Sequence, residues 1–283
     1  MRDYTLFAFD LDGTMLQKDG SLSPRTIAAC QEAAARGIEL VPTTGRLLGF
    51  LPKSLTDLPF IRYAVTSNGA AVYDILSEKR LYSCLLPWQQ AIDILDLLRE
   101  FPVYVEIYAE GRPVVRQGDP ARAFEVYGFP EYKGLYLKKN YLQVQSLREY
   151  IKEGQVCPEK INLPYVPEGL RQELRRLLLQ QEGLNLVSSV FDNLEINAAG
   201  CHKGNGLAAL CQILGIDREH TAAIGDNGND REMLEYAGLS IAMGNATQEI
   251  KKIAGAVTAS CEEDGAALAI EKYLLKKSGC DMA

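Results

Sequence analysis

The segment Phe7-Ala8-Phe9-Asp10-Leu11-Asp12-Gly13-Thr14 decides how the rest of the sequence is interpreted, because an apolar run ends there on two acids. A buried strand that stops on an acid delivers that acid to the carboxyl edge of a sheet, where open α/β folds bind their ligands. Asp10 and Asp12 would repel each other at this edge unless a cation lies between them or one of them carries a proton. This segment is therefore a candidate active site.

A second acidic edge follows much later, in Ala222-Ala223-Ile224-Gly225-Asp226-Asn227-Gly228-Asn229-Asp230. Glycine, asparagine and aspartate are also common in polar turns, and this segment alone fits a turn equally well. Two acidic edges in one sequence favour a metal site, since Mg²⁺ prefers oxygen ligands and keeps several waters. We expect Mg²⁺ to bind to Asp10, Asp226 and a backbone carbonyl, and we include Asp12 among the residues of the metal site.

The composition is that of a globular protein, with 283 residues of which 47% are hydrophobic and 24% charged. No apolar run approaches the ~18 residues that a membrane helix needs, and the acids near the start disfavour a signal peptide. The net charge of -7 disfavours a nucleic-acid partner. The 7 scattered cysteines include no C-x-x-C pair and indicate reduced thiols. We therefore expect a cytoplasmic protein that binds neither membranes nor nucleic acids.

Strand and helix patterns alternate at both ends of the sequence. Ser23-Pro24 is typical of a helix start, and Gly37 is typical of the residue after a helix end. We expect strands at residues 4–10, 38–43, 63–67, 221–224, 239–243 and 256–258, and helices at residues 24–36, 207–214, 232–237 and 263–276. This alternation predicts an α/β fold with a doubly wound, parallel, Rossmann-like sheet.

The middle of the sequence differs from both ends. Residues 70–85 are typical of a hairpin, and the region that follows is richer in tyrosine and proline. Expected helices at residues 88–100, 141–152 and 168–181 are separated there by strand-like stretches at 103–108 and 160–164. An α+β domain inserted into a discontinuous core is the simplest organisation. We expect the core at residues 1–84 and 188–283 and the insert at residues 85–187.

Two further segments are suited to binding phosphate. Thr43-Thr44-Gly45-Arg46 supplies hydroxyls, an unhindered backbone N–H and a guanidinium at a strand end, and these are the donors that an oxyanion needs. Taken alone, Thr-Thr-Gly is more typical of a capping role. Lys203 lies just before an amphipathic helix, where its ammonium group can reach the same edge of the sheet.

The sequence resembles the haloacid dehalogenase (HAD) superfamily in four motifs, which are DLDGT, TTGR, a Lys-Gly pair before a helix, and GDNGND. They occur in this order, and the large insert lies between the second and the third. The insert follows Ser67-Asn68-Gly69-Ala70 and precedes Leu194-Glu195-Ile196, which resembles the Cof-like branch of HAD phosphatases with its type C2 α/β cap. The resemblance covers essentially the whole chain. One local departure is His202, because the family often has serine or threonine before the lysine.

The resemblance implies a role for each matching residue. Asp10 would be the nucleophile, Asp12 the general acid and base, and Asp226 a Mg²⁺ ligand. Thr44 and Lys203 would stabilise the phosphoryl group, Asn229 and Asp230 would contact it, and Asp230 would also orient Lys203 from outside the reacting groups. Further expected substrate contacts are Gly45, Arg46, Asn68 and Lys160.

These features together predict a Mg²⁺-dependent phosphomonoester hydrolase that acts on a small phosphorylated metabolite, with a sugar phosphate favoured, through an aspartyl-phosphate intermediate. A phosphomutase is the alternative on the same fold, because an aspartyl-phosphate can pass its phosphoryl group back to a sugar hydroxyl. A signalling or binding module that carries a phosphorylated aspartate is the alternative from another class. This alternative is disfavoured because such modules are about half this length. They also carry that aspartate on a later strand, whereas Asp10 follows the first strand.

Overall fold

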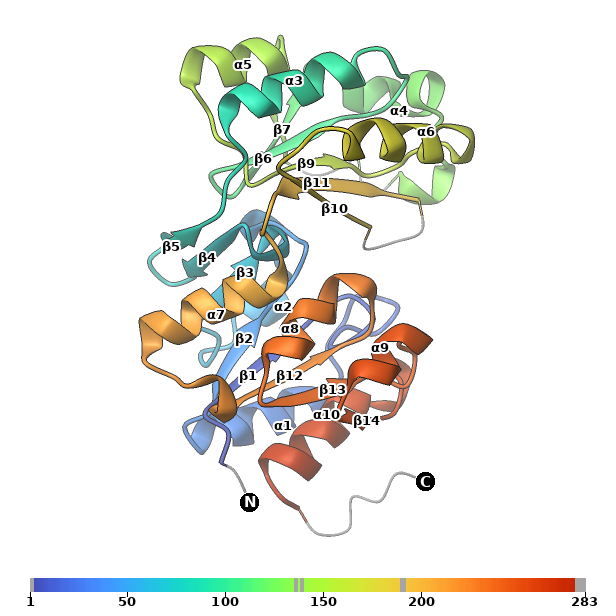
Figure 1. The fold of residues 1–283 in the computed structure, drawn as a ribbon. Helices are drawn as coiled ribbons and strands as arrows, with labels where there is room; N and C mark the ends of the chain where they lie inside the picture. Colours follow the sequence, from blue (N-terminus) through green and yellow to red (C-terminus); the bar gives the residue numbers. More distant parts are fainter. Residues whose placement is uncertain (1–2, 135–136, 138–139, 189–191, 278–283) are drawn as a thin grey trace. The chain divides into compact units, whose positions relative to one another are not determined.

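The structure is a computed structural model that describes residues 3–134, 137, 140–188 and 192–277. The chain forms two compact units. Residues 1–83 and 202–283 form the first, called the core unit here, and residues 84–201 form the second, called the inserted unit. Figure 1 labels the helices and strands of both units.

A five-stranded parallel sheet lies at the centre of the core unit, in the order β14-β13-β12-β1-β2. Its strands are β1 (Leu6–Phe9), β2 (Glu39–Pro42), β12 (Thr221–Gly225), β13 (Leu239–Ala242) and β14 (Ala256–Val257). The chain proceeds from β1 to β2 in one direction along the sheet and from β12 through β13 to β14 in the other. The direction therefore reverses between β1 and β12, which is the position where doubly wound sheets bind ligands.

Helices cover both faces of this sheet. They are α1 (Pro24–Ala35), α2 (Lys53–Thr56), α7 (Lys203–Leu214), α8 (Arg231–Tyr236), α9 (Gln248–Ile253) and α10 (Gly265–Ala269), which continues as a π-helical turn at Ile270–Leu274. Right-handed crossovers that run in opposite directions along a sheet place their helices on opposite faces. Accordingly, α1 packs with α10 and α7 packs with α8 (Figure 1). The doubly wound fold class predicted from the sequence is confirmed.

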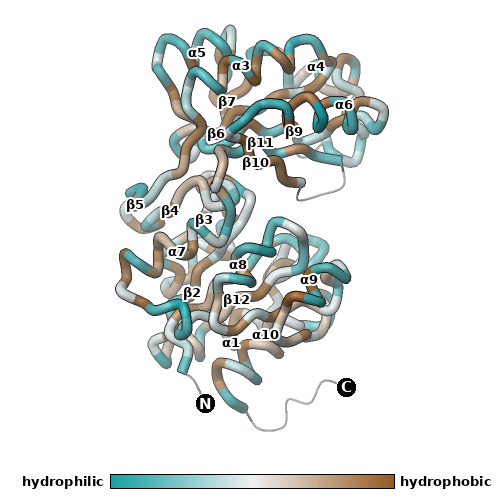
Figure 2. The backbone as a smooth tube through the Cα atoms, viewed as in Figure 1, coloured by the Kyte–Doolittle hydropathy of each residue, from teal (hydrophilic) through white to brown (hydrophobic). Residues whose placement is uncertain are grey.

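The sequence signals for the first strand and helix also hold. All four side chains of β1 are buried, and Figure 2 shows the sheet strands among the most hydrophobic parts of the core unit. The Ser23 hydroxyl accepts a hydrogen bond from the Thr26 N–H at 3.1 Å, with Pro24 in the first helical position. An N-cap and a buried apolar strand thus fix the first β-α unit.

A small antiparallel sheet completes the core unit. It contains β3 (Tyr63–Thr66), β4 (Ala71–Asp74) and β5 (Lys79–Ser83) in sequence order. The hairpin expected at residues 70–85 is therefore present as β4 and β5. A single parallel bridge between Thr43 and Val65 connects β3 to the end of β2. Short 3₁₀ turns lie at Leu48–Phe50, Ser67–Gly69, Arg218–His220, Gly228–Asp230 and Cys261–Glu263.

The inserted unit is built on a six-stranded sheet in the order β10-β11-β9-β6-β7-β8. Its strands are β6 (Glu106–Ala109), β7 (Arg112–Arg116), β8 (Leu142–Val144), β9 (Lys160–Leu163), β10 (Leu184–Val187) and β11 (Leu194–Ala198). Its helices are α3 (Trp88–Leu98), α4 (Asp119–Tyr127), α5 (Leu147–Gly154) and α6 (Glu168–Leu179), with a 3₁₀ turn at Glu131–Lys133. All strand pairs are antiparallel except β7 with β8. The expected α+β class of the insert is confirmed.

Two expectations for the insert differ from the structure. The expected boundary between residues 187 and 188 falls between β10 and β11, which pair with each other, so the unit extends to Cys201. The helix expected at residues 141–152 begins only at Leu147, because Ser146 caps it by accepting a hydrogen bond from the Glu149 N–H at 3.2 Å. The residues before this cap form β8 instead.

Candidate active site

Two acidic loops meet in the core unit where the strand order reverses. Asp10 follows β1 and Asp226 follows β12, and these strands are hydrogen-bonded neighbours. The Asp10 N–H donates to the Ile224 carbonyl at 3.1 Å, which extends the pairing to the first acid itself. Gly13 has a φ of +84°, and a Cβ atom there would lie 2.6 Å from an Asp226 carboxylate oxygen. The glycine of DLDGT thus permits both the turn and the close approach of the second acidic loop.

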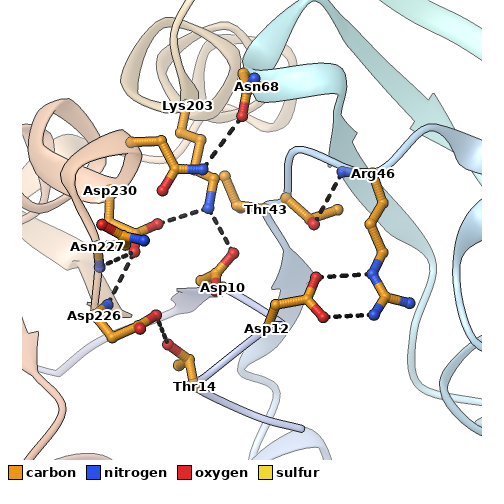
Figure 3. A network of polar contacts seen from close by, with 12 residues as sticks. Asp10, Asp12, Thr14, Thr43, Arg46, Asn68, Lys203, Asp226, Asn227 and Asp230 are labelled. Atoms are coloured by element: carbon orange, nitrogen blue, oxygen red, sulfur yellow. Dashed lines mark hydrogen bonds and ion pairs between the residues drawn. The ribbon is translucent and has the colours of Figure 1, made fainter. Parts of the chain in front are cut away.

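Lys203 joins these loops through two ion pairs (Figure 3). It is the first residue of α7, and its fully buried Nζ lies 2.5 Å from Asp10 Oδ1 and 2.6 Å from Asp230 Oδ1. The second oxygen of Asp230 accepts hydrogen bonds from the Asp226 and Asn227 N–H groups at 2.9 and 3.0 Å. Asp230 therefore holds both the ammonium group and the loop that carries Asp226.

Negative charge exceeds positive charge among these groups, of which Asp10, Asp230 and Lys203 are buried and Asp226 is half-buried. Ligand oxygens of Asp10, Asp226 and Asp230 all lie within 4.8 Å of one another, with Lys203 as the ammonium group that pairs with two of them. Burial, followed by the other carboxylates, raises the pKa of Asp10 well above its ordinary value despite Lys203. Burial and Asp230 raise the pKa of Asp226 to about 6. Burial acts to lower the pKa of Lys203, but Asp10 and Asp230 outweigh it and raise that pKa.

Such a cluster fits a divalent cation. Carboxylate oxygens are the donors that Mg²⁺ and similar hard cations prefer, and a cation would relieve the repulsion that raises the pKa values of Asp10 and Asp226. Asp230 already uses both oxygens, whereas the hydrogen bond from the Thr14 hydroxyl to Asp226, at 3.0 Å, occupies Oδ1. Asp10 and Asp226 are accordingly the carboxylates best placed to hold a metal.

Asp12 lies differently from the other acids. Its carboxylate accepts two hydrogen bonds from the Arg46 guanidinium, at 2.5 and 2.8 Å, and its side chain is 59% exposed (Figure 3). The third carboxylate of the cluster is Asp230, and the expected place of Asp12 in the metal site stays a prediction. A bidentate ion pair with an arginine fixes the orientation of a carboxylate. Asp12 is therefore a separate, oriented acid at the rim of the cluster.

The phosphate-binding segment expected at Thr44, Gly45 and Arg46 packs against a second loop. The Asn68 N–H donates to the Thr44 carbonyl at 3.0 Å, and the Thr44 N–H donates to the Val65 carbonyl at 2.9 Å. Thr44 is buried, and its hydroxyl accepts a hydrogen bond from the Arg46 N–H at 3.2 Å, which stabilises the turn between these two residues. The structure thus brings these residues to the same side of the core unit as Asp10.

The loop that carries Asn68 has a strained backbone. Ser67 and Asn68 have φ values of 51° and 58°, in the left-handed region that non-glycine residues seldom adopt, and both are buried. The Asn68 side chain accepts a hydrogen bond from the Asn229 side chain at 3.3 Å. Strained positions of this kind cluster at functional sites. Asn68 and Asn229 therefore link the loop after β3 to the acidic loop after β12.

His202 takes the place of the serine or threonine common in the family. Its ring Nδ1 accepts a hydrogen bond from the Asn205 N–H at 3.2 Å and caps α7. An imidazole nitrogen thus performs the task of a hydroxyl, one residue before Lys203.

Sequence reasoning missed two contacts of the site. The Thr14 hydroxyl binds Asp226, and the Asn245 amide donates to the Gly13 carbonyl at 2.8 Å. Both contacts join residues more than two hundred positions apart, and no local pattern signals them. The place of Thr14 directly after DLDG was the available hint.

The geometry can be compared with known proteins. A model of the haloacid dehalogenase-like hydrolase family matches residues 7–270. Phosphatase YwpJ of Bacillus subtilis is 31% identical over 280 residues, which cover 93% of this chain and 97% of that protein. The 5-amino-6-(5-phospho-D-ribitylamino)uracil phosphatase YcsE of the same bacterium is 29% identical, with 96% of this chain and 97% of that protein covered.

A solved structure, that of a haloacid dehalogenase-like hydrolase from B. subtilis, has a TM-score of 0.80 and 29% identity, and covers 95% of this chain and 100% of the other. The chain has a doubly wound core with a separate, mostly antiparallel insert, and phosphatases match it along nearly its whole length. The protein is therefore a phosphatase of the HAD type. The chain belongs to the haloacid dehalogenase-like hydrolase family. The resemblance to the Cof-like branch is likewise confirmed. Among the described residues, none of the helices is long and apolar enough to cross a membrane.

Proposed function

We propose that this protein is a Mg²⁺-dependent phosphomonoester hydrolase that forms an aspartyl-phosphate on Asp10. The observation that carries the proposal is the excess of buried carboxylates around Lys203, at the point where the strand order reverses. This arrangement is unfavourable in an isolated protein and becomes favourable once a divalent cation is bound, and that cation can in turn attract a phosphate.

The metal would be held by Asp10 and Asp226. Bound there, Mg²⁺ would neutralise charge between Asp10 and an anionic phosphate. Thr14 orients Asp226 through its hydroxyl, and Asp230 holds the backbone of the same loop. These contacts fix the ligand geometry, which Mg²⁺ needs because it demands near-ideal coordination.

Asp10 would act as the nucleophile. Its carboxylate attacks phosphorus and the leaving oxygen departs, so that one difficult displacement is divided into two easier ones. Lys203 stays beside Asp10 throughout, because Asp230 holds its ammonium group from the other side. That fixed cation stabilises the negative charge of the transferring group without reorganisation. Thr44, Gly45 and Asn229 would supply hydrogen-bond donors to the phosphoryl oxygens.

Asp12 would move the protons. In the first step it donates a proton to the leaving oxygen, and in the second it takes one from the water that attacks the aspartyl-phosphate. Arg46 fixes the Asp12 carboxylate in the free enzyme. The guanidinium is also a donor for a substrate oxyanion, so Arg46, Asn68 and Lys160 remain our candidates for contacts to the substrate.

The substrate would be a small phosphorylated metabolite, and we favour a sugar or polyol phosphate. The name of the relative YcsE describes action on a compound whose phosphate is carried by a ribityl group, an open-chain polyol. We also propose a cytoplasmic location, because the described cysteines are free thiols and reduced thiols are typical of that compartment.

A panel of phosphorylated metabolites tests this function directly. Purified protein with Mg²⁺ should release inorganic phosphate from a subset of sugar and polyol phosphates, and the Asp10→Asn variant should release none. The same samples, analysed for isomerised sugar phosphate, separate hydrolysis from mutase activity. Retention of the phosphate in an isomer, or release by the Asp10→Asn variant at the parent rate, would contradict the proposal.

A further inference from the structure

Two cysteine thiols meet where the chain enters and leaves the inserted unit. Cys84 is its first residue and Cys201 its last. Cys84 Sγ lies 3.9 Å from the carbonyl oxygen of Ala199, two residues before Cys201, and the two thiols are hydrogen-bonded to each other. The fold therefore brings together two sulfur atoms that are separated in the sequence by almost the entire unit.

The two thiols have different surroundings. Cys84 is half-buried, whereas Cys201 is fully buried. The hydrogen bond with Cys84, together with burial, raises the pKa of Cys201, and the nearby Lys160 ammonium acts in the opposite direction. Reactive cysteines are typically partly exposed and close to a positive charge. Cys84 is thus the sulfur that solution reagents reach first, and Cys201 is held beside it.

We propose that Cys84 and Cys201 form an oxidative modification site, at which a small disulfide such as oxidised glutathione produces a reversible Cys84–Cys201 disulfide. The Cys84 thiolate attacks one sulfur of the reagent, which forms a mixed disulfide and releases one small thiolate. The Cys201 thiolate then attacks the Cys84 sulfur and releases the second. Two electrons pass from the cysteines to the reagent, and the two thiol protons go to the released thiolates.

This bond would close residues 84–201 into a covalent loop and tie the two connections to the core unit together. Closing a long loop removes conformational freedom from the unfolded chain and stabilises the folded one. The inference goes beyond the proposed function and does not rest on it, because neither cysteine belongs to the proposed phosphatase site.

The test uses the full-length protein with oxidised glutathione as the reagent. After treatment we expect two fewer titratable thiols, a cross-linked peptide that contains Cys84 and Cys201, and a thermal midpoint above that of the reduced protein. Dithiothreitol should reverse all three. Cys84→Ser and Cys201→Ser should each abolish the cross-link. Cys157→Ser is the matched control, because Cys157 is also half-buried, with Sγ 3.8 Å from the Gln155 carbonyl, and should retain the cross-link.

Two results would overturn the inference. One is a stable glutathione adduct on Cys84 in the parent protein, because Cys201 should displace it. The other is a Cys84–Cys201 cross-link that leaves the thermal midpoint unchanged, because the closed loop would then not constrain the unit. Peptide mapping of the parent decides the first point even where a serine variant folds poorly. Phosphate release by the reduced protein is measured alongside, so failure here is distinguishable from failure of the phosphatase assignment.

Discussion

Both units bury a lysine among acids, yet they do so in opposite ways. In the inserted unit Lys160 pairs with Glu195 at 2.8 Å, and Asn193 donates to the other oxygen of Glu195 at 2.9 Å. Glu106 nearby accepts from Tyr141 and Asn162, both at 2.8 Å. In the core unit one lysine faces three carboxylates, and burial raises the pKa values of Asp10 and Asp226.

The difference distinguishes buried charge that is fully hydrogen-bonded from buried charge that is left in excess. In the inserted unit both carboxylate oxygens of Glu195 and both of Glu106 accept a hydrogen bond, which is how proteins tolerate buried charge. The core cluster leaves negative charge in excess, which costs stability unless a cation compensates for it. Buried carboxylates whose pKa values are raised by one another, as in the core unit, therefore indicate a ligand of opposite charge.

The largest effect is expected when the charge of the proposed nucleophile is removed from the core cluster. Asp10→Asn should remove phosphate release by at least about 10³-fold, because an amide cannot form the acyl phosphate. The variant should fold, and without metal its thermal midpoint should be no lower than that of the parent, since a repelling carboxylate is gone. Phosphate-release assays and thermal melts check both points. Substantial turnover by the purified variant would place the nucleophile elsewhere.

Metal removal is the next largest effect expected. Activity should vanish in excess chelator and return with Mg²⁺, while Ca²⁺ should support little turnover because its looser coordination misplaces the attacking oxygen. Asp226→Ala should raise the Mg²⁺ concentration for half-maximal activity by at least about tenfold. Asp217→Ala, which removes an exposed acid of the same unit, should leave it unchanged. Full activity in chelator would contradict the metal site.

Asp12 tests the proton-transfer role of the rim acid. Asp12→Asn should slow hydrolysis of a sugar phosphate by about 10² to 10⁴-fold, because the poor leaving group needs a proton. Nitrophenyl phosphate, whose leaving group needs little assistance, should be affected much less. Turnover numbers for both substrates with parent and variant provide the measurement. Equal losses for the two substrates would exclude an acid role in the first step.

The pKa of Asp226 predicts a pH dependence of stability in the metal-free protein. Because this pKa rises from 3.8 to about 6 on folding, the folded state binds the proton more tightly. The resulting stabilisation is present below about pH 4 and is lost as the pH rises through about 6. Thermal melts in chelator should show this loss, and Asp226→Asn should flatten it. Mg²⁺ should stabilise the parent more at pH 8 than at pH 5.

In the inserted unit, removal of a buried charge should lower stability and leave activity nearly unchanged, the reverse of the result expected for Asp10→Asn. Lys160→Met leaves Glu195 buried without its ammonium partner, which should cost about 3 to 5 kcal/mol of stability. Hydrolysis of nitrophenyl phosphate at low temperature should change little, because the residues proposed to contact the phosphoryl group all belong to the core unit. Urea unfolding and steady-state kinetics check the two statements. A Lys160→Met variant as stable as the parent would show that the ion pair with Glu195 does not stabilise the inserted unit.

Much of the core unit could be predicted from the sequence because its signals are local. Apolar runs that end on Asp10 and Asp226 place two acids at the carboxyl edge of a parallel sheet wherever else the chain goes. Ser23-Pro24 marks a helix start because the serine hydroxyl can cap the first turn and proline suits the first helical position. The placement of Lys203 before a helix was similarly readable, because α7 begins at that residue.

The remaining features depend on contacts that no local pattern encodes. The ion pair of Asp12 with Arg46 depends on the orientation of the two side chains. The motifs themselves predict other roles, namely proton transfer or metal binding for Asp12 and a substrate contact for Arg46. Thr14 binds Asp226 across 212 positions. The second domain boundary was misplaced because the alternation in β11 fits either sheet, and only its pairing with β9 and β10 assigns it to the inserted unit.

The most direct test of the central claim is to locate the phosphoryl group. Enzyme mixed with a rapidly reacting aryl phosphate and Mg²⁺, quenched in acid within one turnover and digested, is analysed by mass spectrometry. The account predicts phosphate on the peptide that contains Asp10, dependent on Mg²⁺ and missing in Asp10→Asn. Phosphate on another residue, or an Asp10 peptide that stays unmodified while product accumulates in a burst, would contradict it.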